Sequence, residues 1–315
     1  MQNKLSMKKR IAYLLLIIAT VIWGLAFVAQ KAAAGIPPFT VGVIRSLFAA
    51  IFLICLIPIT DRLTKNGRRL FNSKKLPDFN RAELIGGVVL GVILTIATTF
   101  QQYGISGDTD AGKAAFITAL YVVVVPILSA LFGKKPSVNA IISIPFAIVG
   151  FYLLCIKPGV DFAISDLLVL ICALIFACHI IAVDRLSPGC DGVRMSCVQF
   201  ITALVLNAIA MPFEPAADPA ELLSALPSLL FLGVLSSGVA YTFQILGQKD
   251  TDPTVSSLIL SMESLFGVVG AAIVLGERME IREYIGCGIV FLAMLLAQLD
   301  MNTVLAYFRR KNERS

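Results

Sequence analysis

The chain has 315 residues, of which 58% are hydrophobic and 15% charged, and its mean hydropathy is +0.88. Soluble globular proteins carry charge on about a quarter of their residues, so this composition excludes an ordinary soluble domain and indicates a membrane protein. The net charge of +6 is accounted for by basic loops at one membrane face, so it is no sign of a nucleic-acid partner.

Apolar runs of about 20 residues recur along the chain, each long enough to cross a bilayer of about 30 Å as a helix. The sequence predicts ten spans, at 11–31, 39–60, 84–105, 111–133, 138–157, 166–184, 193–213, 226–248, 254–276 and 282–305. The polar remainder is too short for a separate soluble domain, which predicts an all-α polytopic membrane protein. The basic residues before the first run are typical of a signal peptide, but the run is too long for one, so it is predicted as a transmembrane helix.

Lys and Arg are divided unevenly between the two sets of loops. With the N-terminus inside, the cytoplasmic segments hold 20 of them and the outer segments five, while Arg45 lies within a span. Because basic residues stay on the cytoplasmic side, both termini are predicted to be cytoplasmic. The basic stretch from Arg62 to Arg81 is interpreted as an anchor to the anionic headgroups of the lipid bilayer.

The second half of the chain repeats motifs of the first half. Leu90-Gly91-Val92 and Asp108-Thr109-Asp110 recur 142 residues later as Leu232-Gly233-Val234 and Asp250-Thr251-Asp252. Further upstream, Lys31, Arg45 and Pro58 fall on Arg185, Gln199 and Pro212, displaced by 154 residues. We therefore predict two five-helix repeats, 1–157 and 158–315. A five-span unit reverses direction on its second pass, so the copies form an inverted pair, as is typical of secondary transporters that bind substrate between their repeats.

Two spans related by the repeat carry polar side chains at helical spacing. The third span presents Thr95, Thr99 and Gln102, and the eighth presents Ser237, Tyr241 and Gln244 at the equivalent positions. Polar groups are costly against lipid, so these stripes face the protein interior. We predict that they line a substrate cavity, with hydrogen bonding between helices in a dry interior as the alternative.

Glu263 lies about ten residues into the ninth span, and small residues share its helical face. A carboxylate at this depth is costly unless it is neutral, paired or hydrated. We predict that Glu263 binds a substrate ammonium group or carries a coupling proton. The alternative is a protonated or hydrogen-bonded group that fixes the helix packing. Its repeat partner is Tyr121, which is also predicted to contact substrate.

Three further residues within spans are candidates of lower rank. Trp23, the only tryptophan, shares a helical face with Gln30 and is predicted to form an aromatic wall of the site, although packing alone also explains it. His179, the only histidine, is a second candidate for proton coupling, but a lone buried histidine is more often a satisfied interior group. Arg45 is interpreted as a structural charge that reaches the headgroups or braces a neighbouring helix end, with attraction of an anionic substrate group or pairing with a carboxylate as the alternatives.

No motif of another chemistry is present. The chain has no phosphate-binding loop, no HExxH and no CxxC pair, and its seven cysteines lie mostly inside spans. We therefore predict no catalytic residues, no metal and no cofactor, and transport driven by ATP would need a separate subunit. Asp110 and Asp252 precede helices and are interpreted as N-caps rather than as site residues.

Together these residues resemble the EamA family of the drug/metabolite transporter superfamily. The resemblance covers about residues 10–300. It is carried by Ile22-Trp23-Gly24, Lys31, Arg45, Glu263, Gly276-Glu277-Arg278 and Tyr284-Ile285-Gly286. It implies a carrier of small metabolites in the cytoplasmic (inner) membrane, often an exporter of amino acids or related compounds, that works by alternating access. It also implies a central cavity lined by helices 1, 3, 4, 6, 8 and 9. The second repeat departs from the pattern at Ala177-Cys178, which replaces Trp23-Gly24.

The prediction is therefore a secondary transporter whose partners are a small-molecule substrate and the lipid bilayer. The alternative within the superfamily is a multidrug or nucleotide-sugar carrier, and the latter is disfavoured because only Arg45 lies deep enough in a span to meet a phosphate. A membrane-embedded enzyme or a passive channel is disfavoured because clustered catalytic groups, charged rings and filter loops are missing from the sequence. A lateral dimer stays open, since one chain already contains both repeats.

Overall fold

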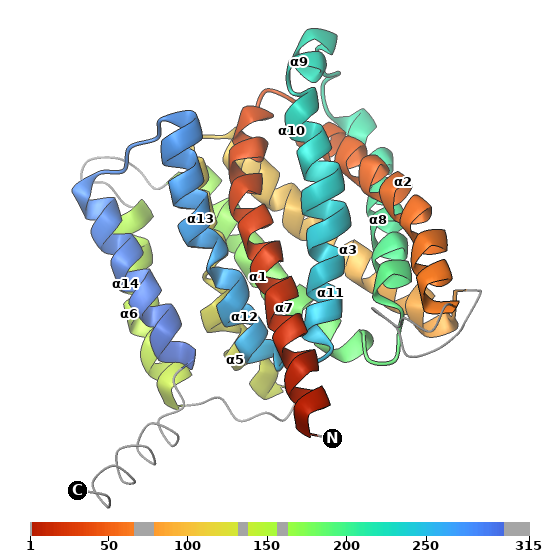
Figure 1. Cartoon of the computed structure of the whole chain (residues 1–315). Coiled ribbons are helices and arrows are strands. Elements are labelled where there is room, and N and C mark those ends of the chain that lie inside the picture. Colours follow the sequence, from red (N-terminus) through yellow and green to blue (C-terminus); the bar gives the residue numbers. More distant parts are fainter. Residues whose placement is uncertain (1, 66–78, 132–137, 156–162, 299–315) are drawn as a thin grey trace, which may run out of the picture.

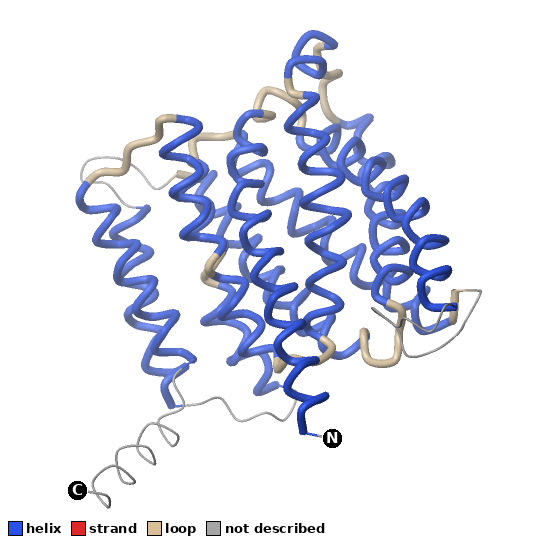
Figure 2. Tube along the Cα trace, in the orientation of Figure 1, coloured by secondary structure: helices blue, strands red, loops and turns tan. Residues whose placement is uncertain are grey.

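The computed structural model describes residues 2–65, 79–131, 138–155 and 163–298. Every regular element in these ranges is a helix, which confirms the all-α prediction (Figure 2). The α-helices are α1 Gln2–Ala32, α2 Pro38–Lys65, α3 Arg81–Ser106, α4 Ala111–Thr118, α5 Tyr121–Leu131, α6 Val138–Cys155, α7 Ile164–Leu186, α8 Gly192–Ala210, α9 Pro219–Ser224, α10 Leu226–Leu230, α11 Tyr241–Gln248, α12 Pro253–Ser261, α13 Glu263–Gly270 and α14 Ile281–Gln298. Met211–Phe213 form the 3₁₀-helix η1, while Phe231–Ala240 and Ala271–Leu275 form the π-helices η2 and η3.

Within the described ranges, eight helical stretches are long and apolar enough to cross a membrane. They are Lys8–Ala32, Pro38–Arg62, Arg81–Ser106, Ala111–Leu131, Ile164–Leu186, Gly192–Phe213, Leu226–Gln248 and Pro253–Leu275. These stretches correspond to eight of the ten predicted spans. The other two predictions, 138–157 and 282–305, fall on α6 and α14, which have 18 residues each. Residues 156–157 and 299–305 lie outside the described ranges.

The exterior of the helix bundle is apolar and much of its interior is polar. Large hydrophobic side chains such as Ile51, Ile85 and Ile148 are more than half exposed, whereas Arg45 and Glu263 are almost completely buried. An extended apolar exterior suits a hydrocarbon surrounding and would be a liability in water. The distribution therefore agrees with a body that is immersed in lipid.

The helices are arranged around a central group with one pair at each end (Figure 1). Helices α6 and α14 pack against each other at one end, and α2 packs against α8 at the other. Between them lie α1, α3, α7, α11 and the segments α4–α5 and α12–α13, whose side chains form the largest hydrophobic cluster. The central group positions the candidate site.

Two helices of the central group are interrupted near their midpoints. The segment α4–α5 breaks at Ala119-Leu120, and α12–α13 breaks at Met262, 142 residues beyond Leu120. Backbone hydrogen bonds tighten to 3₁₀ spacing there, as from Val123 to Leu120 and from Leu265 to Met262. Each second half begins with a predicted site residue, Tyr121 in α5 and Glu263 in α13. Discontinuous helices of this kind form substrate sites in several transporter folds.

Glycines allow some of the closest helix contacts. A Cβ atom added at Gly91 in α3 would lie 2.6 Å from the carbonyl oxygen of Gln199 in α8. A Cβ atom added at Gly24 in α1 would lie 2.3 Å from the Cβ atom of Phe266 in α13. Any larger residue at these positions would separate the helices that surround the central cavity.

The Gly91→Ala variant should therefore lower the thermal stability of the purified protein. The added methyl group has no room against Gln199, and overpacking of this kind costs about 1–3 kcal/mol. Gly288→Ala is the matched control, because a Cβ atom at Gly288 in α14 meets no atom within 4 Å. Thermal unfolding followed in detergent should show a clear loss for Gly91→Ala and none for Gly288→Ala. Equal behaviour of both variants would contradict the close α3–α8 contact.

Candidate functional site

A central cavity of about 450 Å³ lies among α1, α2, α3, α4, α5, α7, η2, α11, α12 and α13. Six of the residues singled out in the sequence line it: Trp23, Arg45, Tyr121, Tyr241, Gln244 and Glu263. They come from five different elements in the two halves of the chain. The structure thus brings together residues that are up to 240 positions apart.

Aromatic side chains form one wall of the cavity. The rings of Trp23 and Tyr241 have centroids 4.6 Å apart, and Phe200 lies behind Tyr241 at 5.6 Å. The indole Nε1 of Trp23 donates to the backbone oxygen of Ser236, at 3.2 Å. Ser236 belongs to the π-helix η2, a helix type often found at functional sites. This hydrogen bond fixes the orientation of the indole ring within the wall.

The acidic side of the cavity lies where the two interrupted helices meet. Glu263 is only 4% exposed and forms no ion pair with any described residue. Tyr121 lies beside it, and its hydroxyl interacts with the Glu263 carboxyl group, although it has no hydrogen-bond partner of good geometry among the described residues. The acid and the phenol therefore form a pair whose remaining hydrogen-bonding capacity is left for a ligand.

Arg45 lies on the cavity wall rather than at a membrane surface. Its side chain is buried, with 6% of the residue exposed, and its Nε donates to Ser237 Oγ at 3.1 Å. This placement differs from that of a side chain that reaches the headgroups. Ser237, predicted to line the cavity itself, instead orients Arg45 from η2.

Part of the predicted polar stripe on α3 lies elsewhere. Thr95 donates to the carbonyl of Gly91 in its own helix, at 2.7 Å, and does not line the cavity. Thr99 and Gln102 line a second hollow of about 200 Å³ between α2, α3 and α8, which Arg45 and Asn207 also line. Gln102 also donates to the backbone oxygen of Gln30, at 3.3 Å.

The sequence reasoning missed several polar residues of the cavity. Gln101, and not Gln102, faces it from α3, and its Nε2 donates to Thr118 Oγ1 at 3.2 Å. Thr118 lies one helical turn before Tyr121, a spacing that could have identified it. Gln30 shares the helical face of Trp23, so its lining position follows from that face. The sequence pattern gave no sign of Ser236, because the group with which it binds Trp23 is its backbone oxygen and not its side chain.

His179 lies one layer behind the cavity wall. Its ring is completely buried, contacts Tyr241 edge to face at 5.9 Å and shares a hydrogen bond of 3.3 Å between its Nε2 and Gln199 Oε1. It is not among the residues that line the cavity. Any effect of His179 on substrate would therefore act through Tyr241.

The end of the bundle that is predicted to face outward is tied together by three contacts. Lys31 at the end of α1 donates to the carbonyl groups of Ile105, Gly107 and Thr109, at 3.1 to 3.3 Å. Lys113 of α4 forms an ion pair of 2.6 Å with Asp166 of α7. Glu277, which follows η3, accepts from the backbone N–H groups of Ala111 and Gly112 at the start of α4, both at 3.0 Å.

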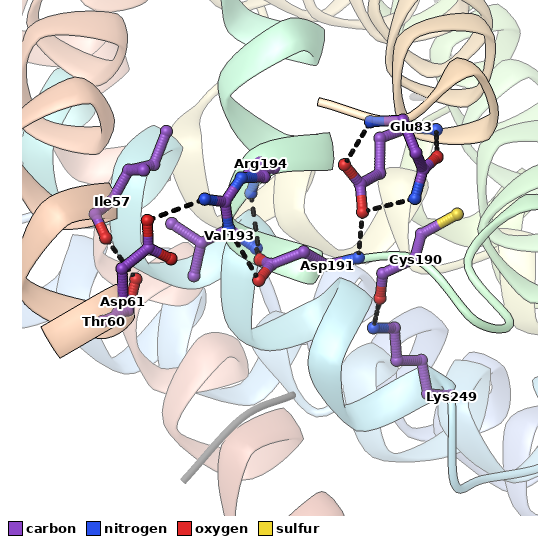
Figure 3. Close-up of polar contacts among 10 residues, drawn as sticks. Ile57, Thr60, Asp61, Glu83, Cys190, Asp191, Val193, Arg194 and Lys249 are labelled. Atoms are coloured by element: carbon purple, nitrogen blue, oxygen red, sulfur yellow. Dashed lines mark hydrogen bonds and ion pairs between the residues drawn. The ribbon is translucent and has the colours of Figure 1, made fainter. Parts of the chain in front are cut away.

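A second network lies at the end that is predicted to be cytoplasmic (Figure 3). Arg194 of α8 pairs with Asp61 of α2 at 2.7 Å and with Asp191 at 3.3 Å. The backbone N–H of Asp191 donates to Glu83 of α3 at 2.8 Å. Lys249, which follows α11, donates to the carbonyl of Cys190, and burial lowers the pKa of its ammonium group. We name Asp61, Glu83, Asp191, Arg194 and Lys249 the cytoplasmic cluster, after the side of the membrane that the distribution of Lys and Arg predicts for it.

Among the described residues, no three His, Cys, Asp or Glu side chains gather in a way that could hold a metal ion. What the site offers instead is a buried carboxyl group, a buried guanidinium group, aromatic faces, and amide and hydroxyl groups. Such a set can bind and orient a small polar molecule and exchange a proton with it.

Comparison with known proteins agrees with this arrangement. A model of the EamA-like transporter family matches residues 10–156 and 163–299, which confirms the resemblance predicted from the motifs. A protein of Archaeoglobus fulgidus, described as an uncharacterized transporter, is 28% identical over 297 residues, covering 93% of this chain and 87% of the relative. A crystal structure of another protein aligns with 91% of this chain and 96% of its own, with a TM-score of 0.64 at 16% identity, and so supports the fold alone.

The cytoplasmic cluster should contribute to stability through Arg194. Arg194→Gln leaves Asp61 and Asp191 without their shared cation, and loss of such charged hydrogen bonds costs about 1–3 kcal/mol. The control is Arg185→Gln, because the Arg185 side chain is 46% exposed and its Nε lies 4.0 Å from Asp184. In thermal unfolding, only Arg194→Gln should show a marked loss. An unchanged midpoint in that variant would contradict the proposed contribution of the cluster.

Proposed function

The chain belongs to the EamA-like transporter family, and on that premise we propose that it is a secondary transporter of amino acids or related small metabolites. It carries them across the cytoplasmic membrane by alternating access, in the direction of export, with both termini in the cytoplasm. The observation that carries this proposal is the buried central cavity, in which an isolated acid faces aromatic and amide groups.

Unsatisfied polar atoms around the cavity support a polar ligand. Gln30 Oε1, Gln244 Oε1 and the Tyr121 hydroxyl are buried without hydrogen-bond partners among the described residues. A buried polar atom without a partner costs about 1–3 kcal/mol. A substrate with N–H or O–H donors would supply the missing bonds.

We propose that the fold consists of ten transmembrane helices in two inverted repeats, 1–157 and 158–315. The packing supports this arrangement, because contacts recur when equivalent elements are exchanged. Helix α3 packs on α7 as α11 packs on α1, and α5 packs on α7 as α13 packs on α1. Likewise, α4 packs on α13 as α12 packs on α5. Two helices pack directly on their own repeat equivalents: α2 packs on α8, and α6 packs on α14. The two separate family matches, 10–156 and 163–299, further support it.

Alternating access requires that the cavity open to one side at a time. The outer contacts of Lys31, Lys113 and Glu277 hold α1, α3, α4 and α7 together. The cytoplasmic cluster holds α2, α3 and α8 together. We propose that these two networks break in turn, and that the interruptions at Leu120 and Met262 allow the halves of their helices to move separately.

Within this cycle Glu263 has the central role. As a buried carboxylate without an ion-pair partner among the described residues, it binds a substrate ammonium group or takes up a proton when that group leaves. The Tyr121 hydroxyl then donates to whichever oxygen is free. His179, behind Tyr241, is a secondary candidate for coupling that lacks direct access to the cavity.

The test of the proposed function is uptake of a radiolabelled amino-acid mixture into proteoliposomes, with and without an imposed pH gradient. Saturable uptake that the gradient accelerates would support a proton-coupled carrier. Saturable uptake that ignores the gradient would support a facilitator in which Glu263 binds ligand only. With folded protein shown by gel filtration, no uptake above empty liposomes would contradict the amino-acid assignment.

Glu263→Gln should abolish stimulation by the pH gradient and lower uptake at least about 10-fold, because the neutral amide neither pairs with an ammonium group nor exchanges a proton. The matched control is Glu221→Gln, which removes an exposed carboxylate on α9 and should leave uptake unchanged. Gel filtration checks that both variants fold. Full uptake and full gradient response in Glu263→Gln would remove Glu263 from the mechanism.

His179→Gln should change uptake by less than about threefold, because an amide can replace the hydrogen bond to Gln199 and the ring does not reach the cavity. The gradient response should persist. Loss of that response, with uptake at zero gradient intact, would instead assign the coupling proton to His179.

A further inference from the structure

Arg45 is a buried cation that has no carboxylate partner in the part of the chain that the structure describes. Its one hydrogen bond there runs from Nε to Ser237 Oγ, at 3.1 Å. The two terminal nitrogens of its guanidinium group therefore meet no protein acceptor within the described ranges. By contrast, Arg194 is equally buried but pairs with Asp61 and Asp191. An unpaired buried charge is expensive, so an anion from outside the chain is the natural partner of Arg45.

The position of Arg45 is that of a ligand-binding group. It lines both the central cavity and the second hollow of about 200 Å³, and thus lies where the two adjoin. Of the described residues that line either hollow, Arg45 is the one basic side chain and Glu263 the one acidic side chain. The combined space therefore carries one fixed positive and one acidic group, a pattern complementary to a ligand that also carries one charge of each sign.

Unpartnered amide oxygens belong to residues that line the same two hollows. Gln102 Oε1, in the second hollow, and Gln30 Oε1 and Gln244 Oε1, in the central cavity, are buried without partners among the described residues. These acceptors would repel a dianion with many oxygens but would accept N–H and O–H donors. A lone guanidinium group matches a single carboxylate, to which its terminal nitrogens donate in parallel. A phosphate group is usually met by several cations or by helix N-termini.

We propose that Arg45 binds the carboxylate of the transported substrate and thereby selects for it. Ser237 positions the guanidinium group, and Glu263 takes the opposite end of the substrate. The inference rests on the proposed function and adds that the site requires a carboxylate. Arg45 is thus a substrate-binding residue and not a structural brace of α2.

The experiment is competition against uptake of the radiolabelled amino-acid mixture in proteoliposomes. The competitors are the same amino acids unlabelled, their carboxamides and their decarboxylated amines. For the wild-type protein, the acids should compete at least about 10-fold better than either analogue, because a charge-assisted hydrogen-bond pair is lost. In Arg45→Gln, uptake should fall at least about 10-fold, and the residual uptake should distinguish acids from amides by less than about threefold. Arg45→Lys should keep part of the discrimination.

Arg185→Gln is the matched control, since it removes an arginine that is about half exposed and lies outside both hollows, and it should behave as the wild type. A structural role for Arg45 predicts lower uptake with the acid-to-amide ratio unchanged, and that result would overturn the inference. Equal competition by amides in the wild type would overturn it without any variant and would leave the proposed function standing. No uptake by the wild type would overturn the proposed function, and the inference with it. If Arg45→Gln fails to fold, the acid-to-amide competition ratio measured in Arg45→Lys tests the inference in its place. A ratio equal to that of the wild type would then overturn it.

Discussion

The cost of a charge in an apolar interior is the constraint on which this structure depends. Glu263 and Arg45 are each nearly inaccessible, and no described residue neutralises either of them. Such groups persist only where polar surroundings or a ligand offset their desolvation. The central cavity supplies those surroundings, because amides, hydroxyls and aromatic rings from seven elements converge on it. The glycine contacts between α1 and α13 and between α3 and α8 then hold those elements close enough to enclose it.

Much of the architecture could be predicted because two physical signals are strong. Long apolar runs locate the membrane helices almost regardless of context, since lipid tolerates few other structures. The repeat displacement of 142 residues then relates Tyr121 to Glu263, and the structure places both at helix interruptions beside one cavity. The interruptions themselves left no mark in the sequence. Neither Leu120 nor Met262 is a proline or glycine, and Pro126 lies farther along α5.

The rotation of each helix about its axis was the less predictable part. Gln101 and Gln102 are neighbours, yet they face different hollows, because adjacent helical residues point about 100° apart. Which one faces inward depends on how α3 packs against α7 and α8. Contacts between residues that are far apart in the sequence could not be predicted either. Asp110 occupies the N-cap position of α4 as expected, but its side chain makes no cap hydrogen bond, and Glu277 accepts from the first two N–H groups of that helix. Asp252 caps α12 with its side chain, as expected.

The hydrogen bond from Trp23 to the Ser236 carbonyl has a practical consequence. Trp23 is the only tryptophan of the chain, so all indole fluorescence of the protein originates at the cavity wall. Its ring packs at a tilt against Tyr241 and donates a hydrogen bond to Ser236 of a π-helix, and both neighbours belong to the opposite half of the chain. The emission wavelength and quantum yield therefore report on local polarity and on the separation of the two halves. The native protein thus carries an intrinsic optical probe of its own interior, with no label attached.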